Sequence, residues 1–195
     1  MAAQLGVKNI NALAMLAHAP VPDSEARLVR HDFAGLPGFE LILPRGEAAA
    51  WWQRLVQHGA APAGYQTLDV LRIEAGLPWP GRELDQTVLA PETGQIERGI
   101  SYRKGCYLGQ EIIERMRAHD ALAKRLVRLR VPDGAGLELP AVLRRDNLEV
   151  GRITSLVRHP TQPCWPGLGY LKTAVTGFAD ITAGDPPRPV TILTG

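Results

Sequence analysis

The chain has 195 residues and a formal net charge of +2, which allows one large or two small domains and does not indicate a polyelectrolyte partner. Hydrophobic residues make up 45% and charged residues 22% of the sequence, as in ordinary globular proteins. The cysteines, Cys106 and Cys164, suggest no disulfide framework. No apolar run approaches the roughly 20 residues that cross a membrane, and no secretory leader is visible. These features predict a cytoplasmic protein without a membrane partner.

The first part of the chain is expected to contain two helices and a hairpin. Residues 1–16 are apolar and nearly uncharged, which predicts a packed helix. Extended runs at 27–33 and 39–43 are joined by a turn of glycine and proline, and they predict a β-hairpin. Apolar residues at helical spacing predict a helix over 47–58. Its two adjacent tryptophans are interpreted as packing residues rather than as a platform for nucleic-acid bases.

The middle of the chain is less regular. Residues 64–74 fit a helix running into a strand, and the apolar periodicity does not decide between the two. Repeated prolines and glycines over 75–93 predict a long irregular connection, and connections of that length are often functional. A short strand is expected at 100–102, leading into the loop that contains Cys106.

That loop places a cysteine between two glycines, and it reads Lys104-Gly105-Cys106-Tyr107-Leu108-Gly109-Gln110-Glu111. Glycine permits positive φ and close approach of the backbone to another surface. An amphipathic helix is expected to follow from Gln110. A thiol close to a helix N-terminus and to basic side chains would have a lowered pKa and favour the thiolate. The alternative is that Cys106 is a small buried hydrophobe, and spacing alone leaves both interpretations open.

The last third of the chain is expected to be β-structure. Apolar residues alternate over 124–131, which predicts a half-buried strand whose outer face carries Arg128 and Arg130. We interpret this face as a charged sheet edge rather than a nucleic-acid surface, because no aromatic residues interleave. Further short strands, separated by turns of proline and glycine, are expected at 142–143, 150–157, 168–171 and 190–193.

This order of elements predicts an α+β fold in two parts. Residues 1–120 would form an α+β region, and residues 121–195 would form a small β-barrel domain. The five histidines are scattered through the sequence and show no metal-ligand spacing, so no metal site is expected.

Three segments resemble one family. Residues 104–111 are similar to the K-G-C-[FY]-x-G-Q-E signature of the YgfZ family of folate-binding, GcvT-like proteins, whose mitochondrial relatives serve iron–sulfur cluster assembly. Residues 71–76 resemble the L-R-x-E-A-G segment that this family shares with the glycine-cleavage T protein, an aminomethyltransferase. Residues 149–155 resemble the V-G-x-[IV]-T-S strand of the C-terminal barrel in the same superfamily.

The resemblance implies an aminomethyltransferase (GcvT)-like folate-binding fold, with tetrahydrofolate as the cofactor and Cys106 as the functional thiol. It matches Glu74 to the carboxylate that contacts the pterin ring, with Arg72 and Gly76 beside it. A carboxylate can pair with two pterin N–H groups at once. The alternative for Glu74 is a salt bridge to Arg72 or to another surface group. The other cofactor-binding candidates belong to the cysteine loop and are Lys104, Gly105, Tyr107, Gly109, Gln110 and Glu111.

Three functions follow from these observations. The first is a folate-binding protein that assists iron–sulfur cluster assembly or repair and has iron–sulfur client or assembly proteins as partners. The second is a tetrahydrofolate-dependent aminomethyltransferase. The third is an accessory factor in tRNA modification, although the small net charge does not favour RNA contact.

Family members carry a domain-sized segment ahead of the region matched here, and this segment supplies the catalytic aspartate of the T protein. The sequence is therefore expected to be a shortened form. An incomplete sheet would expose an edge strand, so a homo-oligomer is expected as well.

Overall fold

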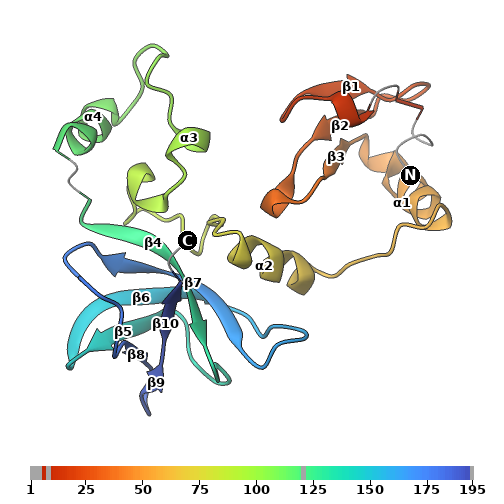
Figure 1. Cartoon of the computed structure of the whole chain (residues 1–195). Coiled ribbons are helices and arrows are strands. Elements are labelled where there is room, and N and C mark those ends of the chain that lie inside the picture. The colour runs from red at the N-terminus through yellow and green to blue at the C-terminus, as the bar shows by residue number, and fades with distance from the viewer. Residues whose placement is uncertain (1–5, 8–9, 120–121, 194–195) are drawn as a thin grey trace. The chain divides into compact units, whose positions relative to one another are not determined.

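A computed structural model of the protein describes residues 6–7, 10–119 and 122–193 (Figure 1). The chain divides into two compact units, Met1–Leu68 and Asp69–Gly195. Helix α2 (Tyr65–Glu74) begins in the first unit and ends in the second.

The first unit is a small antiparallel sheet with one helix. Strands β1 (His18–Pro20), β2 (Arg27–Arg30) and β3 (Phe39–Ile42) pair in that order, and they are followed by α1 (Ala48–Gln57). Buried apolar side chains from β2, from α1 and from the segments that precede and connect the first two strands form one core, which contains Val7, Ile10, Val21, Ala26, Leu28 and Trp51.

Two predictions for this unit are confirmed and one is not. The pairing of β2 with β3 confirms the hairpin, and α1 confirms the helix within residues 47–58. The predicted helix at 1–16 falls partly outside the described residues, and its described part contains only a 3-10 turn, Ile10–Ala12. Of the two tryptophans, Trp51 is buried as a packing residue whereas Trp52 is exposed.

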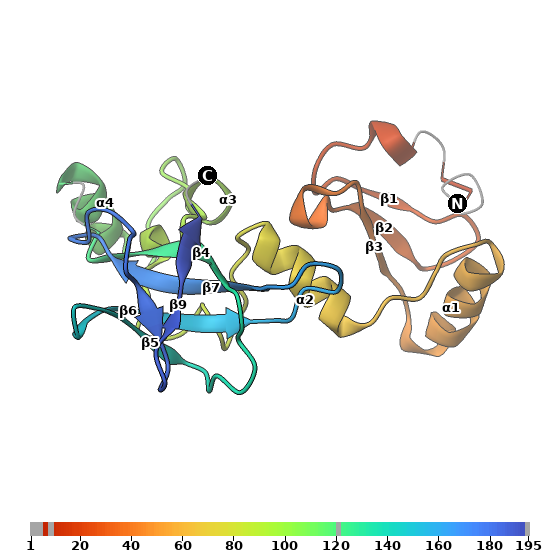
Figure 2. The same cartoon turned by 60° about the horizontal axis from the view of Figure 1, so that its bottom comes forward.

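The second unit is built on a seven-stranded antiparallel sheet that curves into a barrel-like form (Figure 2). Its strand order is β10-β4-β7-β6-β5-β8-β9. The strands are β4 (Lys124–Val131), β5 (Ala141–Arg145), β6 (Leu148–Leu156), β7 (Trp165–Lys172), β8 (Thr182–Ala183), β9 (Arg188–Pro189) and β10 (Thr191–Leu193). The strands expected from the sequence after residue 121 are therefore confirmed.

The predicted alternation of apolar and charged residues in β4 is also confirmed, but the part of β4 that carries Arg128 and Arg130 does not lie at an edge of the sheet. Leu129 and Val131 are fully buried in the core of the barrel, and Arg130 on the other face is exposed. Because residues 128–130 of β4 pair with β10 on one side and with β7 on the other, Arg128 and Arg130 do not protect a sheet edge. Arg128 instead donates from Nη1 to the carbonyl oxygen of Glu74 at 2.9 Å.

Short helical segments and loops connect α2 to β4. They comprise a 3-10 turn at Ala90–Thr93, α3 (Ile96–Gly99) and α4 (Gln110–His119). The helix predicted from Gln110 is confirmed, and so is the irregular connection after α2. The strand predicted at 100–102 is wrong, because these residues form no strand.

The boundary between the two compact units lies after Leu68, whereas the domain boundary was expected at residue 120. The segment after Leu68 is tied to the sheet by buried bonds, such as the one from Arg72 Nη2 to Ser155 Oγ at 2.7 Å. Lys124 also donates to the carbonyl oxygen of Thr87 at 2.7 Å. Residues 69–119 therefore share the second unit with the barrel.

Candidate functional site

The end of α2 is a tight glycine cap. The N–H of Gly76 donates to the carbonyl oxygen of Ile73 at 3.0 Å, and that of Leu77 donates to Arg72 at 2.8 Å. This pair of bonds is a Schellman motif, which needs a left-handed residue at the position of Gly76. Gly76 has a φ of 71°. The sequence therefore requires glycine here for the backbone turn, and a cofactor contact at Gly76 stays a prediction.

Arg72 faces the interior rather than a ligand surface, which corrects the expectation drawn from its motif. Its side chain is 1% exposed and forms a salt bridge at 2.7 Å with Glu83, whose side chain is 0% exposed. A second salt bridge at 2.7 Å joins Arg72 to Asp69. The guanidinium is thus held by carboxylates from α2 and from the following loop, because a buried charge must be paired.

A β-bulge in β6 completes the environment of Glu83. Pairing with β7 shifts register between Ile153 and Ser155, so Thr154 is the extra residue of the bulge. Adjacent strand residues normally face opposite sides of a sheet. Here both hydroxyls donate to the same oxygen, Oε1 of Glu83, from Thr154 at 2.8 Å and from Ser155 at 2.5 Å. The T-S pair of this strand therefore binds an interior carboxylate.

Two neighbouring groups have shifted pKa values. Burial favours the neutral form of Asp69, but hydrogen bonds from Arg82 and Arg72 outweigh it and hold the pKa of this carboxyl below its usual value. Burial and the charge of Glu83 raise the pKa of the Tyr170 phenol. The phenol donates to the carbonyl oxygen of Glu83 at 3.0 Å. Tyr170 therefore remains a neutral donor over the physiological pH range.

Glu74, at the last position of α2, points away from this network. Its side chain is 41% exposed, and Oε1 lies 3.2 Å from Nε2 of His159. The alternative prediction for Glu74 was a salt bridge to Arg72 or to another surface group. In the structure its partner is His159. The carboxylate is still accessible, so the prediction that it contacts a pterin stays open.

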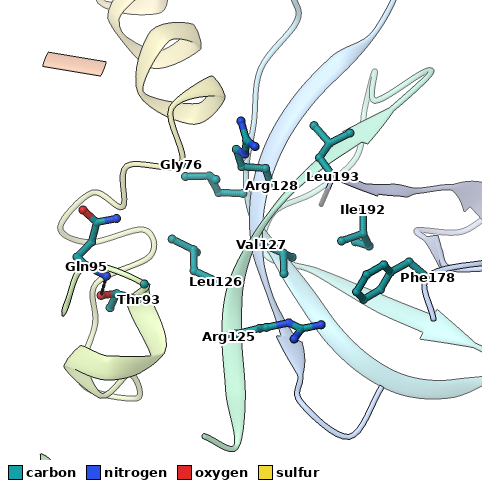
Figure 3. Close-up of a pocket in the computed structure, with 12 residues that line it drawn as sticks. Gly76, Thr93, Gln95, Arg125, Leu126, Val127, Arg128, Phe178, Ile192 and Leu193 are labelled. Carbon is teal, nitrogen blue, oxygen red and sulfur yellow. Dashed lines mark hydrogen bonds between the residues drawn. The ribbon is translucent and has the colours of Figure 1, made fainter. Parts of the chain in front are cut away.

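A pocket of about 540 Å³ lies between the end of α2 and the sheet (Figure 3). Gly76 and Arg128 line it, and so do Gln95 from the connection and Arg125 from β4. The guanidinium of Arg125 lies 5.5 Å from the ring centroid of Phe178, another lining residue. The pocket thus combines two cationic side chains with an aromatic ring, and its size is typical of small-molecule sites.

The cysteine loop is a separate feature on the surface. Cys106 is a free, exposed thiol, so the buried alternative is wrong. Leu108 is fully exposed at 103%. The ammonium of Lys104 lies 4.8 Å from the ring centroid of Tyr107, whose hydroxyl is buried without a hydrogen-bond partner among the described residues. The loop therefore presents Cys106 and Leu108 to solvent.

The remaining loop candidates have local roles. Gly109 has the predicted positive φ, 85°, just before α4, whereas Gly105 is not among the left-handed residues. The N–H of Gln110 donates to the carbonyl oxygen of Tyr107 at 3.2 Å. Glu111 forms an exposed salt bridge with Arg115 at 2.7 Å. No described residue of α4 is buried, so the loop and helix form an exposed surface.

Sequence reasoning missed two residues that shape this region, Glu83 and His159. Glu83 lies in a loop rich in charged residues, and nothing in its pattern indicates burial. His159 was grouped with scattered histidines because its partner, Glu74, is far away in the sequence. The contact depends on the packing of the β6–β7 connection against the end of α2, which the sequence pattern does not indicate.

The described residues contain neither clustered metal ligands nor a long apolar helix. No group of three or more His, Cys, Asp or Glu side chains within them is arranged to hold a metal ion. None of the helices they form combines the length and apolar character that spanning a membrane requires.

Comparisons with known proteins agree on a wider family. Residues 10–103 match the model of the GCVT N-terminal domain. An aminomethyltransferase of Rubrobacter xylanophilus is 33% identical over 181 residues, which cover 89% of this chain and 46% of that protein. A putative chloroplastic transferase of Arabidopsis thaliana is 34% identical, over 76% of this chain and 34% of its own length. The chain thus spans less than half the length of these curated relatives.

A solved structure shows the same fold. The crystal structure of the glycine cleavage system aminomethyltransferase T from Bartonella henselae matches with a TM-score of 0.82, over 98% of this chain and 54% of that chain, at 19% sequence identity. The GcvT-like fold with a barrel-like sheet, expected from three short segments, is therefore confirmed. The narrower identification with the YgfZ family stays a prediction. Residues 10–103 match the GCVT N-terminal domain model, and the chain is similar to aminomethyltransferases in sequence and shares the fold of one of them.

Proposed function

We propose that this protein binds tetrahydrofolate at the C-terminal end of α2 and takes part in one-carbon transfer of the aminomethyltransferase type. The observation that carries the proposal is the accessible carboxylate of Glu74. The backbone carbonyl oxygen of the same residue accepts a hydrogen bond from Arg128, which lines the pocket of about 540 Å³. The names of the relatives favour this function over iron–sulfur cluster assembly.

The residues present fit the chemistry of a reduced folate. The pterin ring offers adjacent N–H donors that a carboxylate such as Glu74 can accept as a pair. The benzoyl ring suits the apolar part of the pocket, which includes Phe178. The glutamate tail carries carboxylates, for which Arg125 is a matching cation. Folate in this site would bring its one-carbon unit to the reaction, and the chain's own residues would bind and orient it.

Replacing Glu74 by alanine is expected to weaken tetrahydrofolate binding by about 10- to 100-fold. The reason is the loss of charge-assisted hydrogen bonds worth roughly 1.5–3 kcal/mol. Isothermal titration calorimetry of the full chain under reducing conditions measures the change.

Glu114→Ala serves as the matched control, because this carboxylate lies on α4 and is also accessible. It should leave the affinity unchanged. Wild-type protein that is folded and binds no tetrahydrofolate would refute the proposal. Equal binding by Glu74→Ala would move the site away from α2.

A second candidate function is assistance in iron–sulfur cluster assembly, and the exposure of Cys106 favours it. Thiolates are the usual ligands of such clusters. The free thiol lies in a loop that also exposes Leu108 completely, so a partner chain could reach both. One accessible cysteine per chain supplies one of the four thiolates of a cluster, so a cluster would have to be shared between two chains and completed by small-molecule thiols.

Anaerobic reconstitution with iron, sulfide and glutathione, which supplies the remaining thiolates, tests this candidate. Wild-type protein is expected to gain the visible absorption of a cluster together with the mass of a dimer, and Cys106→Ser is expected to lose both. Cys164→Ser is the matched control, since Cys164 is buried and should not be needed. Cluster retention by Cys106→Ser, or no cluster on the wild-type chain, would contradict this function.

A further inference from the structure

The connection between β6 and β7 is a closed, well-bonded loop that reaches the end of α2 (Figure 2). The N–H of His159 donates to the carbonyl oxygen of Cys164 at 3.0 Å, and that of Cys164 donates to Gln162 at 2.8 Å. Prolines at positions 160 and 163 restrict the backbone between them. The loop therefore holds His159 in one place.

The bonds of the imidazole ring assign its tautomer. Nδ1 accepts from the backbone N–H of Thr161 at 3.1 Å and from that of Gln162 at 3.0 Å. An atom that accepts two N–H groups carries a lone pair and no proton, so the proton of the neutral ring is on Nε2. Nε2 lies 3.2 Å from Oε1 of Glu74. His159 is therefore arranged as a donor to this carboxylate.

The same ring is well shielded, and its carboxylate partner is not. The side chain of His159 is 10% exposed, whereas that of Glu74 is 41% exposed. The main chain of Glu74 is fixed as well, because Arg128 donates to its carbonyl oxygen at 2.9 Å. Two parts of the barrel thus restrain one glutamate, one through its backbone and one through its carboxylate.

We propose that His159 is a positioning residue, which holds the carboxylate of Glu74 in the orientation that accepts paired N–H donors of a ligand. This inference rests on the proposed function. The donors fit the amino and ring N–H edge of a reduced pterin, which a carboxylate accepts as a planar pair. A fixed carboxylate binds such an edge more tightly, since less side-chain freedom is lost on binding. His159 acts through Glu74 and needs no ligand contact of its own.

His159→Asn separates the two roles of the ring. Asparagine can keep the acceptor for the N–H groups of Thr161 and Gln162, as in an Asx-turn, but its shorter side chain cannot reach Glu74. The substitution is expected to weaken tetrahydrofolate binding by about 3- to 10-fold, the range for one hydrogen bond. In a Glu74→Ala background it should have no further effect, because the two residues act as one unit.

The tautomer gives a readout without ligand. Long-range ¹H–¹⁵N spectra of the wild-type chain should show His159 protonated at Nε2, with a resonance that shifts in Glu74→Ala. His58→Asn, at an exposed histidine in the first unit, is the matched control and should leave affinity unchanged.

The outcomes separate the two proposals. Wild-type protein that binds no tetrahydrofolate overturns the proposed function and the ligand role of His159 together. Wild-type binding that His159→Asn leaves equal or strengthens overturns the positioning role alone. A wild-type ring protonated at Nδ1 and not at Nε2 also overturns it. Additive losses in the double variant would show that His159 acts independently of Glu74.

Discussion

Replacing Arg72 by leucine is expected to lower the free energy of unfolding by about 3–5 kcal/mol, the range for removing one partner of a buried ion pair. The substitution would leave the carboxylate of Glu83 without its countercharge at a site that is 0% exposed. It would also remove the donor to Ser155. Urea denaturation followed by circular dichroism measures the loss.

Arg115→Leu is the control for this variant, because Arg115 pairs with Glu111 on the surface of α4. Exposed ion pairs contribute little, so its unfolding curve should stay close to that of the wild type. The double variant Arg72→Leu/Glu83→Leu should recover part of the loss by removing the unpaired charge. An Arg72→Leu protein as stable as the wild type would mean that the pair contributes nothing to folding.

Gly169→Ala is expected to cost about 3 kcal/mol, near the upper end for overpacking a well-packed interior. A Cβ at this position would lie 2.3 Å from the carbonyl oxygen of Arg152 and 3.1 Å from Cα of Ile153. Both atoms belong to the backbone of β6, so the clash cannot be relieved by rotating a side chain. Strands β6 and β7 would have to separate beside the bulge, and the urea midpoint should fall.

The matched glycine is Gly105 in the cysteine loop. A Cβ there would meet no atom within 4 Å, and its φ is not positive, so Gly105→Ala should unfold like the wild type or slightly later. If Gly169→Ala unfolded like Gly105→Ala, the close approach of β6 and β7 would be disproved.

Periodicity predicted the elements that have one buried face. The alternation of Val127, Leu129 and Val131 gave the bounds of β4, and the apolar stripe around Trp51 gave α1. Periodicity failed at residues 64–74, because α2 buries the charged side chain of Arg72 together with Val70 and Ile73. An arginine at a core position obscures the helical pattern, and the tertiary partner that makes it favourable lies in a later loop.

The site was only partly predictable for a related reason. Glu74 and the cysteine loop were singled out through resemblance to short segments; the structure leaves both accessible, and their roles stay predictions. The interior role of Arg72 and the contact of His159 with Glu74 depend on distant pairing. The bulge at Thr154 has no signal in the residues around it, since it is defined by the register against β7.

The last turn of α2 has a geometric consequence for the proposed ligand site. Arg72 and Glu74 are two residues apart, so their side chains leave the helix axis about 200° apart. One is anchored inside the second unit and the other reaches outward. The interior ion pair thereby sets the rotation of the helix about its axis, and with it the direction of the outer carboxylate. A single residue inserted between them would turn Glu74 by about 100° without changing any residue type, so spacing alone encodes where the carboxylate points.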